Sequence, residues 1–337
     1  MKLHWAWTLI GEGVMDRRQF LLAIPCGALL ASSASAQEPG RVYRMAVISP
    51  AERAVQDLRN LQLPELARLG FVVGRNLTLT THVGPPALMP ELARQAIATK
   101  PDVVVAVSTV AILAVKEASS TVPIVMSFIG EDPIAKGLAV SLARPGGNTT
   151  GIAMLAAQMD GKRASLLHEF VPAARRIAIL TGRPPRHAEG AEEAKRVARE
   201  LGLETDVFYA DEPADYVAAF AGMRTARSEA LVIISAPDFF RDAALLSRLA
   251  LEAGLPTVCE WASMARDGCL IGYGPNYAVL WRRPADYVAR ILRGAKPGEL
   301  PIEQPTVFEF AINLKTAKAL GLTIPQSVLE HADEVIE

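Results

Sequence analysis

The feature that most constrains this chain is an internal repeat, because its two halves carry the same order of apolar blocks about 130 residues apart. Residues 44–49 (RMAVIS) match 176–181 (RIAILT), and residues 103–107 (VVVAV) match 230–234 (ALVII). Each block is a short apolar run that ends near a small or polar residue and leads into a helical pattern. Such runs are typical of parallel strands that are buried on both faces and followed by crossover helices. The repeat therefore predicts an α/β protein with two similar lobes.

Two further pairs extend the repeat and indicate where a ligand would bind. Residues 121–128 (TVPIVMSF) match 254–261 (GLPTVCEW), and residues 69–71 (LGF) match 201–203 (LGL). Open parallel sheets bind ligands outside the carboxyl ends of their strands. Two such lobes that face each other would enclose a cleft, so we expect the functional site between them.

Turn signals divide the chain into four parts. Residues 41–150 form the predicted first lobe, which closes with a helix ending at Arg144 and the helix-breaking turn Pro145–Asn148. Residues 151–275 form the second lobe, which ends at Gly274 and Pro275. Residues 276–337 are expected to cross back and complete both lobes. The remaining part, residues 1–36, is not expected to belong to either lobe.

Residues 1–36 have the pattern of an N-terminal extension followed by an export signal. From the probable start at Met15, paired arginines (Arg17, Arg18) precede an apolar run and the small residues Ala34–Ser35–Ala36. The pattern predicts cleavage after Ala36 and export to the periplasm by the twin-arginine or Sec route. A membrane anchor is the alternative, but the apolar run is shorter than the roughly 20 residues that a bilayer crossing needs. Cys26 allows a lipoprotein interpretation, which Pro25 disfavours.

Charge and cysteine content limit the partners and the redox chemistry. With 35 Lys and Arg against 36 Asp and Glu, the net charge is −1, and no basic stripe is visible to attract nucleic acid. Cys259 and Cys269 lie near the end of one predicted strand and the start of the next. Parallel neighbours place those ends roughly 15 Å apart for a five-residue strand, so free thiols are predicted.

Motifs of catalysis and cofactor binding are missing from the sequence. No G-x-G-x-x-G follows the first predicted strand, and no phosphate-binding G-x-x-x-x-G-K-[ST], G-x-S-x-G or H-E-x-x-H occurs. The histidines after the signal lack the spacing of metal ligands; they are His82, His168, His187 and His331. The sequence therefore predicts a protein that is not an enzyme and that uses no cofactor or metal.

Polar and aromatic groups follow the predicted strands of the first lobe. Ser49 and Pro50 follow the first strand, Ser108 and Thr109 follow the third, and Phe128 ends the fourth. Ser108 and Thr109 stand where a helix begins, and free N–H groups with the helix dipole favour an anion there. We interpret this place as a binding site for a ligand carboxylate, with an ordinary helix cap as the alternative.

The second lobe offers matching groups. Thr181, Asp238, Glu260, Trp261 and Tyr273 lie at or near the ends of its predicted strands. An unpaired carboxylate behind a buried strand is costly, and a ligand ammonium would offset that cost at Asp238. Asp238 capping the following helix is the alternative interpretation. Phe128, Trp261 and Tyr273 are candidates to flank an apolar or aromatic ligand side chain, or else belong to the core.

Several sequence blocks together resemble the ABC transporter substrate-binding proteins related to the tryptophan/tyrosine-binding group. The resemblance covers about residues 41–337. The blocks that carry it are Val47–Pro50, Leu69–Phe71 with Gly74–Leu77, Phe128–Pro133, Leu142–Gly151 (LARPGGNTTG), Tyr273–Pro275 and Phe308–Gly321 (FEFAINLKTAKALG). It implies a type I periplasmic binding protein fold, with two Rossmann-like lobes joined by a hinge and a ligand cleft between them.

The resemblance also implies a function. It indicates a periplasmic protein that captures a small carboxylate-bearing metabolite, in particular an amino acid, and delivers it to the permease of an ABC importer. Such a protein is expected to be a monomer that meets the membrane only through the transporter. A periplasmic sensory receptor of the same fold, signalling to a membrane partner, is the alternative. The chain departs from the family pattern at Thr181–Pro185, where Arg183 would favour a more acidic solute.

Overall fold

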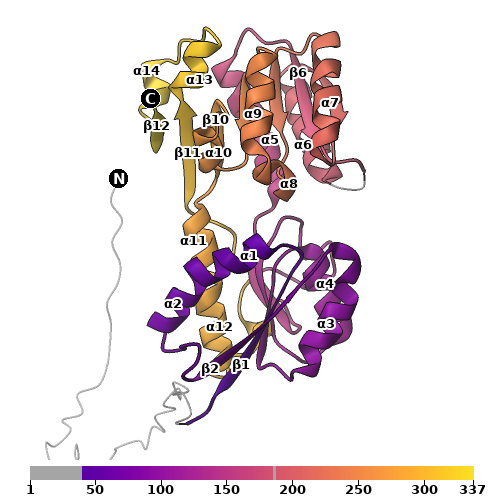
Figure 1. The fold of residues 1–337 in the computed structure, drawn as a ribbon, viewed down its shortest axis with the longest axis vertical. Helices are drawn as coiled ribbons and strands as arrows, with labels where there is room; N and C mark the ends of the chain where they lie inside the picture. The colour runs from indigo at the N-terminus through magenta and orange to yellow at the C-terminus, as the bar shows by residue number, and fades with distance from the viewer. Residues whose placement is uncertain (1–39, 185–186) are drawn as a thin grey trace, which may run out of the picture. The chain divides into compact units, whose positions relative to one another are not determined.

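The computed structural model describes residues 40–184 and 187–337, so the predicted export signal, the cleavage after Ala36 and Cys26 lie outside the described residues (Figure 1). The first lobe is built on a five-stranded sheet in the order β2-β1-β3-β4-β5, and every neighbouring pair is parallel. Its strands are β1 (Tyr43–Ser49), β2 (Leu77–Val83), β3 (Val103–Ala106), β4 (Ile124–Ile129) and β5 (Thr149–Ala153). Its helices are α1 (Glu52–Asp57), the π-helical turn η1 (Leu58–Gln62), α2 (Leu63–Arg68), the 3-10 turn η2 (Pro86–Leu88), α3 (Met89–Ala98) and α4 (Thr109–Ala118).

The second lobe is built on a seven-stranded sheet in the order β12-β11-β10-β9-β8-β6-β7, in which only β10 and β11 pair antiparallel. Its strands are β6 (Arg176–Thr181), β7 (Glu204–Tyr209), β8 (Ala230–Ile233), β9 (Thr257–Cys259), β10 (Ile271–Pro275), β11 (Phe308–Asn313) and β12 (Glu334–Ile336). Its helices are α5 (Ala156–Phe170), α6 (Ala188–Glu200), α7 (Pro213–Thr225), α8 (Pro237–Arg241), α9 (Ala243–Glu252), α10 (Ala262–Arg266), α13 (Leu314–Ala319) and α14 (Gln326–Leu329). The predicted α/β class with two parallel-sheet lobes is confirmed.

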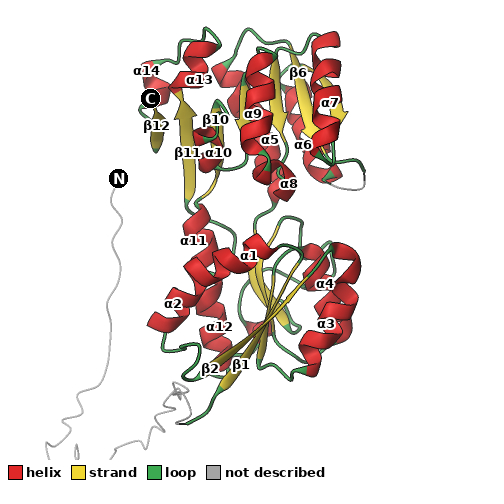
Figure 2. Cartoon of the chain, viewed as in Figure 1, coloured by secondary structure: helices red, strands yellow, loops and turns green. Residues whose placement is uncertain are grey.

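Helices cover both faces of each sheet, which explains the near-continuous apolar strands (Figure 2). In the first lobe, α3 and α4 pack on one face, while α1, η1, α2 and α12 (Pro284–Leu292) pack on the other. In the second lobe, α5 and α6 cover one face, and α7 and α9 cover the other. All four residues of β3 are buried, as a central strand between two helical layers requires.

The chain passes between the two sheets three times. It leaves the first sheet after β5 and leaves the second after β10, and it then forms α11 (Tyr277–Arg282) and α12, which pack on the first lobe. The 3-10 turn η3 (Pro297–Glu299) follows, and Glu303 then forms a parallel bridge with Ile152 of β5 before the chain returns as β11.

The predicted helix ending at Arg144 is wrong, because residues 130–148 form turns and bends. The Asp132 carboxylate accepts a hydrogen bond from the Ile134 backbone N–H (2.8 Å), and Gly137 adopts a φ of +67°. A left-handed residue such as Gly137 interrupts a right-handed helix, and the Asp132 carboxylate offers the backbone a turn in place of a helical hydrogen bond. Local turn chemistry therefore prevents the predicted helix.

The prediction of free thiols is also wrong, since Cys259 and Cys269 form a disulfide with a Cα–Cα distance of 6.5 Å. The prediction assumed two five-residue strands, but β9 has only three residues and β10 begins at Ile271, two residues after Cys269. Cys269 therefore lies in the turn before its strand, where its N–H bonds the Met264 carbonyl oxygen (3.1 Å). The turn brings the second sulfur back to the first.

Within the described part of the chain, no helix has both the length and the apolar character needed to span a membrane.

Candidate functional site

The carboxyl-end edges of the two sheets face each other. Lys136, in the loop after β4, lies 3.6 Å from Glu189, at the start of the helix that follows β6. The guanidinium carbon of Arg53, in the helix after β1, lies 4.4 Å from the ring centroid of Phe240, in the helix after β8. Because both pairs join segments that follow strands, the region between the lobes is bordered by strand ends, where an α/β sheet binds ligands.

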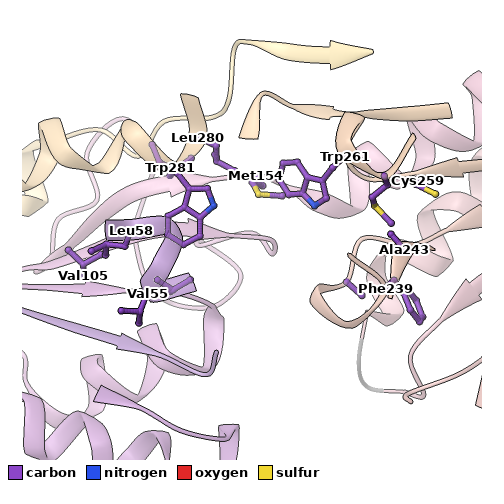
Figure 3. Close-up of a cluster of buried hydrophobic side chains, with 14 of the residues drawn as sticks. Val55, Leu58, Val105, Met154, Phe239, Ala243, Cys259, Trp261, Leu280 and Trp281 are labelled. Carbon is purple, nitrogen blue, oxygen red and sulfur yellow. The ribbon is translucent and has the colours of Figure 1, made fainter. Parts of the chain in front are cut away.

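An aromatic row runs through this region from one lobe to the other. We use this name for Phe240, Trp261, Tyr277, Trp281 and Phe128, whose successive ring centroids lie between 5.2 and 6.2 Å apart. These separations are those of interacting aromatic pairs. Figure 3 shows the two tryptophans with the apolar side chains around them, in a hydrophobic cluster that includes buried residues of both lobes.

The predicted aromatic residues divide between two places. Phe128 and Trp261 both belong to the aromatic row, linked by residues of α11. Tyr273 lies elsewhere: its ring stacks on Phe308 at 6.0 Å and meets Phe310 edge-on at 6.2 Å. The strand β10 extends to Pro275, so Tyr273 lies in the middle of a strand and not at its end.

The start of α4 has the features expected of an anion site, together with an unexpected carboxylate. Ser108 has a φ of +84° and ψ of 153°, a backbone conformation that is costly for a residue with a Cβ. Its buried hydroxyl has no hydrogen-bond partner among the described residues. The Thr109 hydroxyl donates to the carboxylate of Glu131, which therefore lies beside the helix start. The anion at this helix start is therefore a carboxylate of the chain itself.

Ser49, Pro50 and Thr181 lie at strand ends, as predicted. The Ser49 hydroxyl donates to the Ala51 carbonyl oxygen (3.0 Å) and accepts from the Ala51 N–H (3.1 Å), so it stabilises the turn between β1 and α1. Pro50 is partly buried in the same turn. Thr181 is buried at the end of β6, and its hydroxyl lacks a partner in the described part of the chain. Of the three, only Thr181 has a side-chain hydroxyl that no described residue engages.

The two predicted carboxylates of the second lobe differ in environment. Asp238 is partly exposed and forms an ion pair with Arg241 at 3.0 Å. Glu260 is only 7% exposed, and its burial raises the pKa of the carboxyl to about 7, although the nearby Arg163 guanidinium opposes the rise. Arg183 is engaged by Asp211 and Asp215, which removes the reason to expect a more acidic solute.

The sequence patterns did not predict two sets of side chains that lie at the site. Tyr277 and Trp281 contribute to the aromatic row, and the Tyr277 hydroxyl donates to Asp57 at 2.6 Å. Arg163 and Asp160 form a buried ion pair at 2.6 Å beneath the ends of β8 and β9. They belong to α5, whose sequence DGKR suggests a solvated surface. Only the positions of Tyr277 and Trp281, just after Gly274–Pro275, offered a signal.

Among residues 40–184 and 187–337, no three His, Cys, Asp or Glu side chains come together as a metal site would require.

These features define a class of protein: two α/β lobes, three connections between their sheets, and aromatic and polar side chains gathered where the strand ends face each other. Comparison with known sequences identifies the particular family. The family model described as ABC transporter substrate binding protein matches residues 66–336, and the chain belongs to this family. The family consists of solute-binding proteins that act outside the cytoplasm, not of enzymes, which confirms the expectation from the missing catalytic motifs.

Individual relatives agree with this assignment. The chain is 24% identical to a tyrosine-binding protein of Clostridioides difficile (strain R20291) over 239 residues, which are 68% of this chain and 66% of the relative. A conserved domain protein from Vibrio cholerae is similar in structure with a TM-score of 0.79 and 27% identity, covering 88% of this chain and all of the other.

A domain from Streptococcus pneumoniae solved in complex with L-Trp has a TM-score of 0.76 and 22% identity, with 88% of this chain and all of the other covered. A leucine-binding protein from Thermotoga maritima has a TM-score of 0.53 and 15% identity, with 70% of this chain and 71% of the other covered. These two similarities support the fold, which is that of the type I periplasmic binding proteins.

Proposed function

We propose that this protein captures an amino acid with an apolar or aromatic side chain between its lobes in the periplasm, and delivers it to the permease of an ABC importer. The observation that carries the proposal is the aromatic row between the lobes, which lies beside polar groups at the strand ends. A relative named as a tyrosine-binding protein and a similar domain solved in complex with L-Trp support the same ligand class.

The polar groups suit the two charged ends of an amino acid. Ser108 and Thr109 begin α4, where backbone N–H groups and the helix dipole favour the ligand carboxylate. Asp238 and Glu260 supply negative charge for the ammonium from the second lobe. Asp238 would bind the ammonium while it is also paired with Arg241. Glu260 is buried, so water would compete less with the ammonium for its carboxylate. Phe128 and Trp261 would flank the ligand side chain.

A ligand panel tests the class of solute. Mass spectrometry of material carried through purification, followed by calorimetry with the twenty amino acids and common organic acids, should reveal saturable binding of an apolar or aromatic amino acid. Charged hydrogen bonds contribute about 1.5–3 kcal/mol each, so Asp238→Ala should weaken binding roughly tenfold to a hundredfold. The exposed Glu252→Ala is a matched control that should leave affinity unchanged. No saturable heat with any compound would refute the ligand class.

Transport and lobe closure need separate tests. The three connections between the sheets form the proposed hinge, so saturation with ligand should reduce the radius of gyration measured by X-ray scattering. An unchanged radius at saturation would argue against closure. Uptake of the bound amino acid should fall in cells that lack the protein. Normal uptake combined with a lost transcriptional response to the solute would favour the sensory receptor instead.

A further inference from the structure

A buried arginine joins three neighbouring strands beneath the lobe-two side of the site. Arg163 is fully buried, and its Nη1 donates to the Ser235 hydroxyl at 2.7 Å, just beyond β8. Its Nε donates to the Tyr273 carbonyl oxygen in β10 at 2.7 Å, and its Nη2 reaches the Glu260 carbonyl oxygen after β9 at 3.4 Å. One planar guanidinium therefore holds the ends of β8, β9 and β10 together, which its fixed fork of donors makes possible.

Asp160 completes this arrangement one helical turn earlier. Its Oδ1 accepts from Arg163 (2.6 Å), from the Ser235 N–H (3.0 Å) and from the Ser235 hydroxyl (2.9 Å). Its Oδ2 lies so close to α6 that a Cβ on Gly190 would approach it to 2.3 Å. Buried ion pairs are costly to desolvate, and burial raises the pKa of the Asp160 carboxyl, although Arg163 and Ser235 favour its ionised form.

The residues held in this way lead directly into the proposed ligand site. Ser235 precedes the segment that carries Asp238, and Glu260 precedes Trp261 of the aromatic row. The charged groups that act on the Glu260 carboxyl are Arg163, which favours its ionised form, and Asp160, which disfavours it. The neighbouring side chains from the other elements, Ser235 and Trp261, are neutral.

We infer that Arg163 is a positioning residue that fixes Ser235 and Glu260 at the edge of the second lobe, and that Arg163 and Asp160 together set the charge that Glu260 presents to the ligand ammonium. The ligand part of this inference rests on the proposed function. The part that concerns the charge of Glu260 in the ligand-free protein is independent of the proposed function. With a pKa of about 7, the carboxyl ionises as the pH rises, so affinity for an amino acid should increase from pH 6 to pH 8.

Two substitutions should move the ionisation of Glu260 in opposite directions. Arg163→Met removes the positive charge that favours ionisation, so the midpoint pH of the Glu260 titration should rise by about one unit. Asp160→Asn removes the negative charge that opposes ionisation, so the same midpoint should fall by about one unit. The measurement is an NMR titration of the carboxyl carbons in ligand-free protein labelled with ¹³C-glutamate, in which Glu260→Gln assigns the signal. The exposed Arg248→Met is the control and should not shift it.

Arg163→Lys separates the positioning of Ser235 and Glu260 by residue 163 from the effect of its positive charge. Lysine keeps the positive charge but cannot bond Ser235 and Tyr273 together, so the Glu260 midpoint should stay close to the wild-type value while affinity for L-tryptophan or L-tyrosine falls tenfold or more. Asp160→Asn keeps the oxygen that accepts from Ser235 but leaves the buried Arg163 charge unpaired, so Arg163→Lys, which keeps both charges, is the variant expected to fold even if the other two do not. A folded Asp160→Asn protein with an unshifted or raised midpoint would overturn the inference, as would Arg163→Lys with wild-type affinity. Opposite shifts in a protein that binds none of the apolar or aromatic amino acids would support the charge arrangement and refute the proposed ligand.

Discussion

Glu260→Gln should stabilise the ligand-free protein at alkaline pH. The carboxyl has an ordinary pKa of 4.5 and a folded-state pKa of about 7, so the folded protein prefers the protonated form. Below the ordinary pKa both states are protonated and the group costs nothing. Between pH 4.5 and about 7 the carboxyl ionises in the unfolded chain but stays protonated in the folded protein, so the free energy of unfolding falls across this range and levels off above pH 7. A pKa rise of this size lowers the free energy of unfolding by about 3 kcal/mol at pH values above 7. Glutamine keeps the size and polarity but never ionises.

Urea unfolding of residues 37–337 at two pH values measures this effect. We expect the substitution to raise the free energy of unfolding by about 3 kcal/mol at pH 8 and by less than about 1 kcal/mol at pH 5. Exposed Glu252→Gln should have little effect at either pH and controls for a general loss of charge. An equal gain at both pH values would show that ionisation of Glu260 is not the cause. The same substitution should weaken amino-acid binding at pH 8, because the ammonium loses a counter-charge.

Three further substitutions test other parts of the site and the fold. Removal of the disulfide by Cys259→Ala with Cys269→Ala should lower the free energy of unfolding by about 2–3 kcal/mol in chemical denaturation, and unchanged stability would contradict this. Ser108→Gly should stabilise the protein by about 1 kcal/mol, since its φ of +84° suits glycine, yet weaken ligand binding in calorimetry. Tyr277→Phe loses the bond to Asp57 and should cost about 1–3 kcal/mol in the same unfolding assay, whereas a smaller loss would show that Asp57 finds water instead.

The sequence was sufficient to predict the sheets because their strands are apolar on both faces. Val103–Ala106 and Ala230–Ile233 are buried throughout, so hydrophobic runs marked them without any long-range information. Parallel strands then place their carboxyl ends at one edge, which is why Phe128 and Trp261 were predicted near the site and lie in one aromatic row. These predictions depend only on periodicity and chain direction.

Predictions failed where one or two residues of strand length decided the outcome. The three-residue length of β9 allows the Cys259–Cys269 disulfide, and the extension of β10 to Pro275 keeps Tyr273 within the sheet. Strand ends depend on pairing with neighbouring strands, which apolar patterning does not specify to within one residue. Site residues at the edge of a sheet are therefore less predictable than the sheet itself.

The Arg163 arrangement could not be predicted for a different reason. Its hydrogen bonds join α5 to residues 72 and 110 positions later in the chain, so no local window contains both partners. In the sequence, Asp160 and Arg163 form an (i, i+3) pair of the kind that usually lies in solvent. Burial becomes possible only because β8, β9 and β10 present polar groups at one point, and Gly190 lets α6 approach from the other side. A buried charge of this kind is specified by several distant elements at once, and it holds the ends of β8, β9 and β10 together.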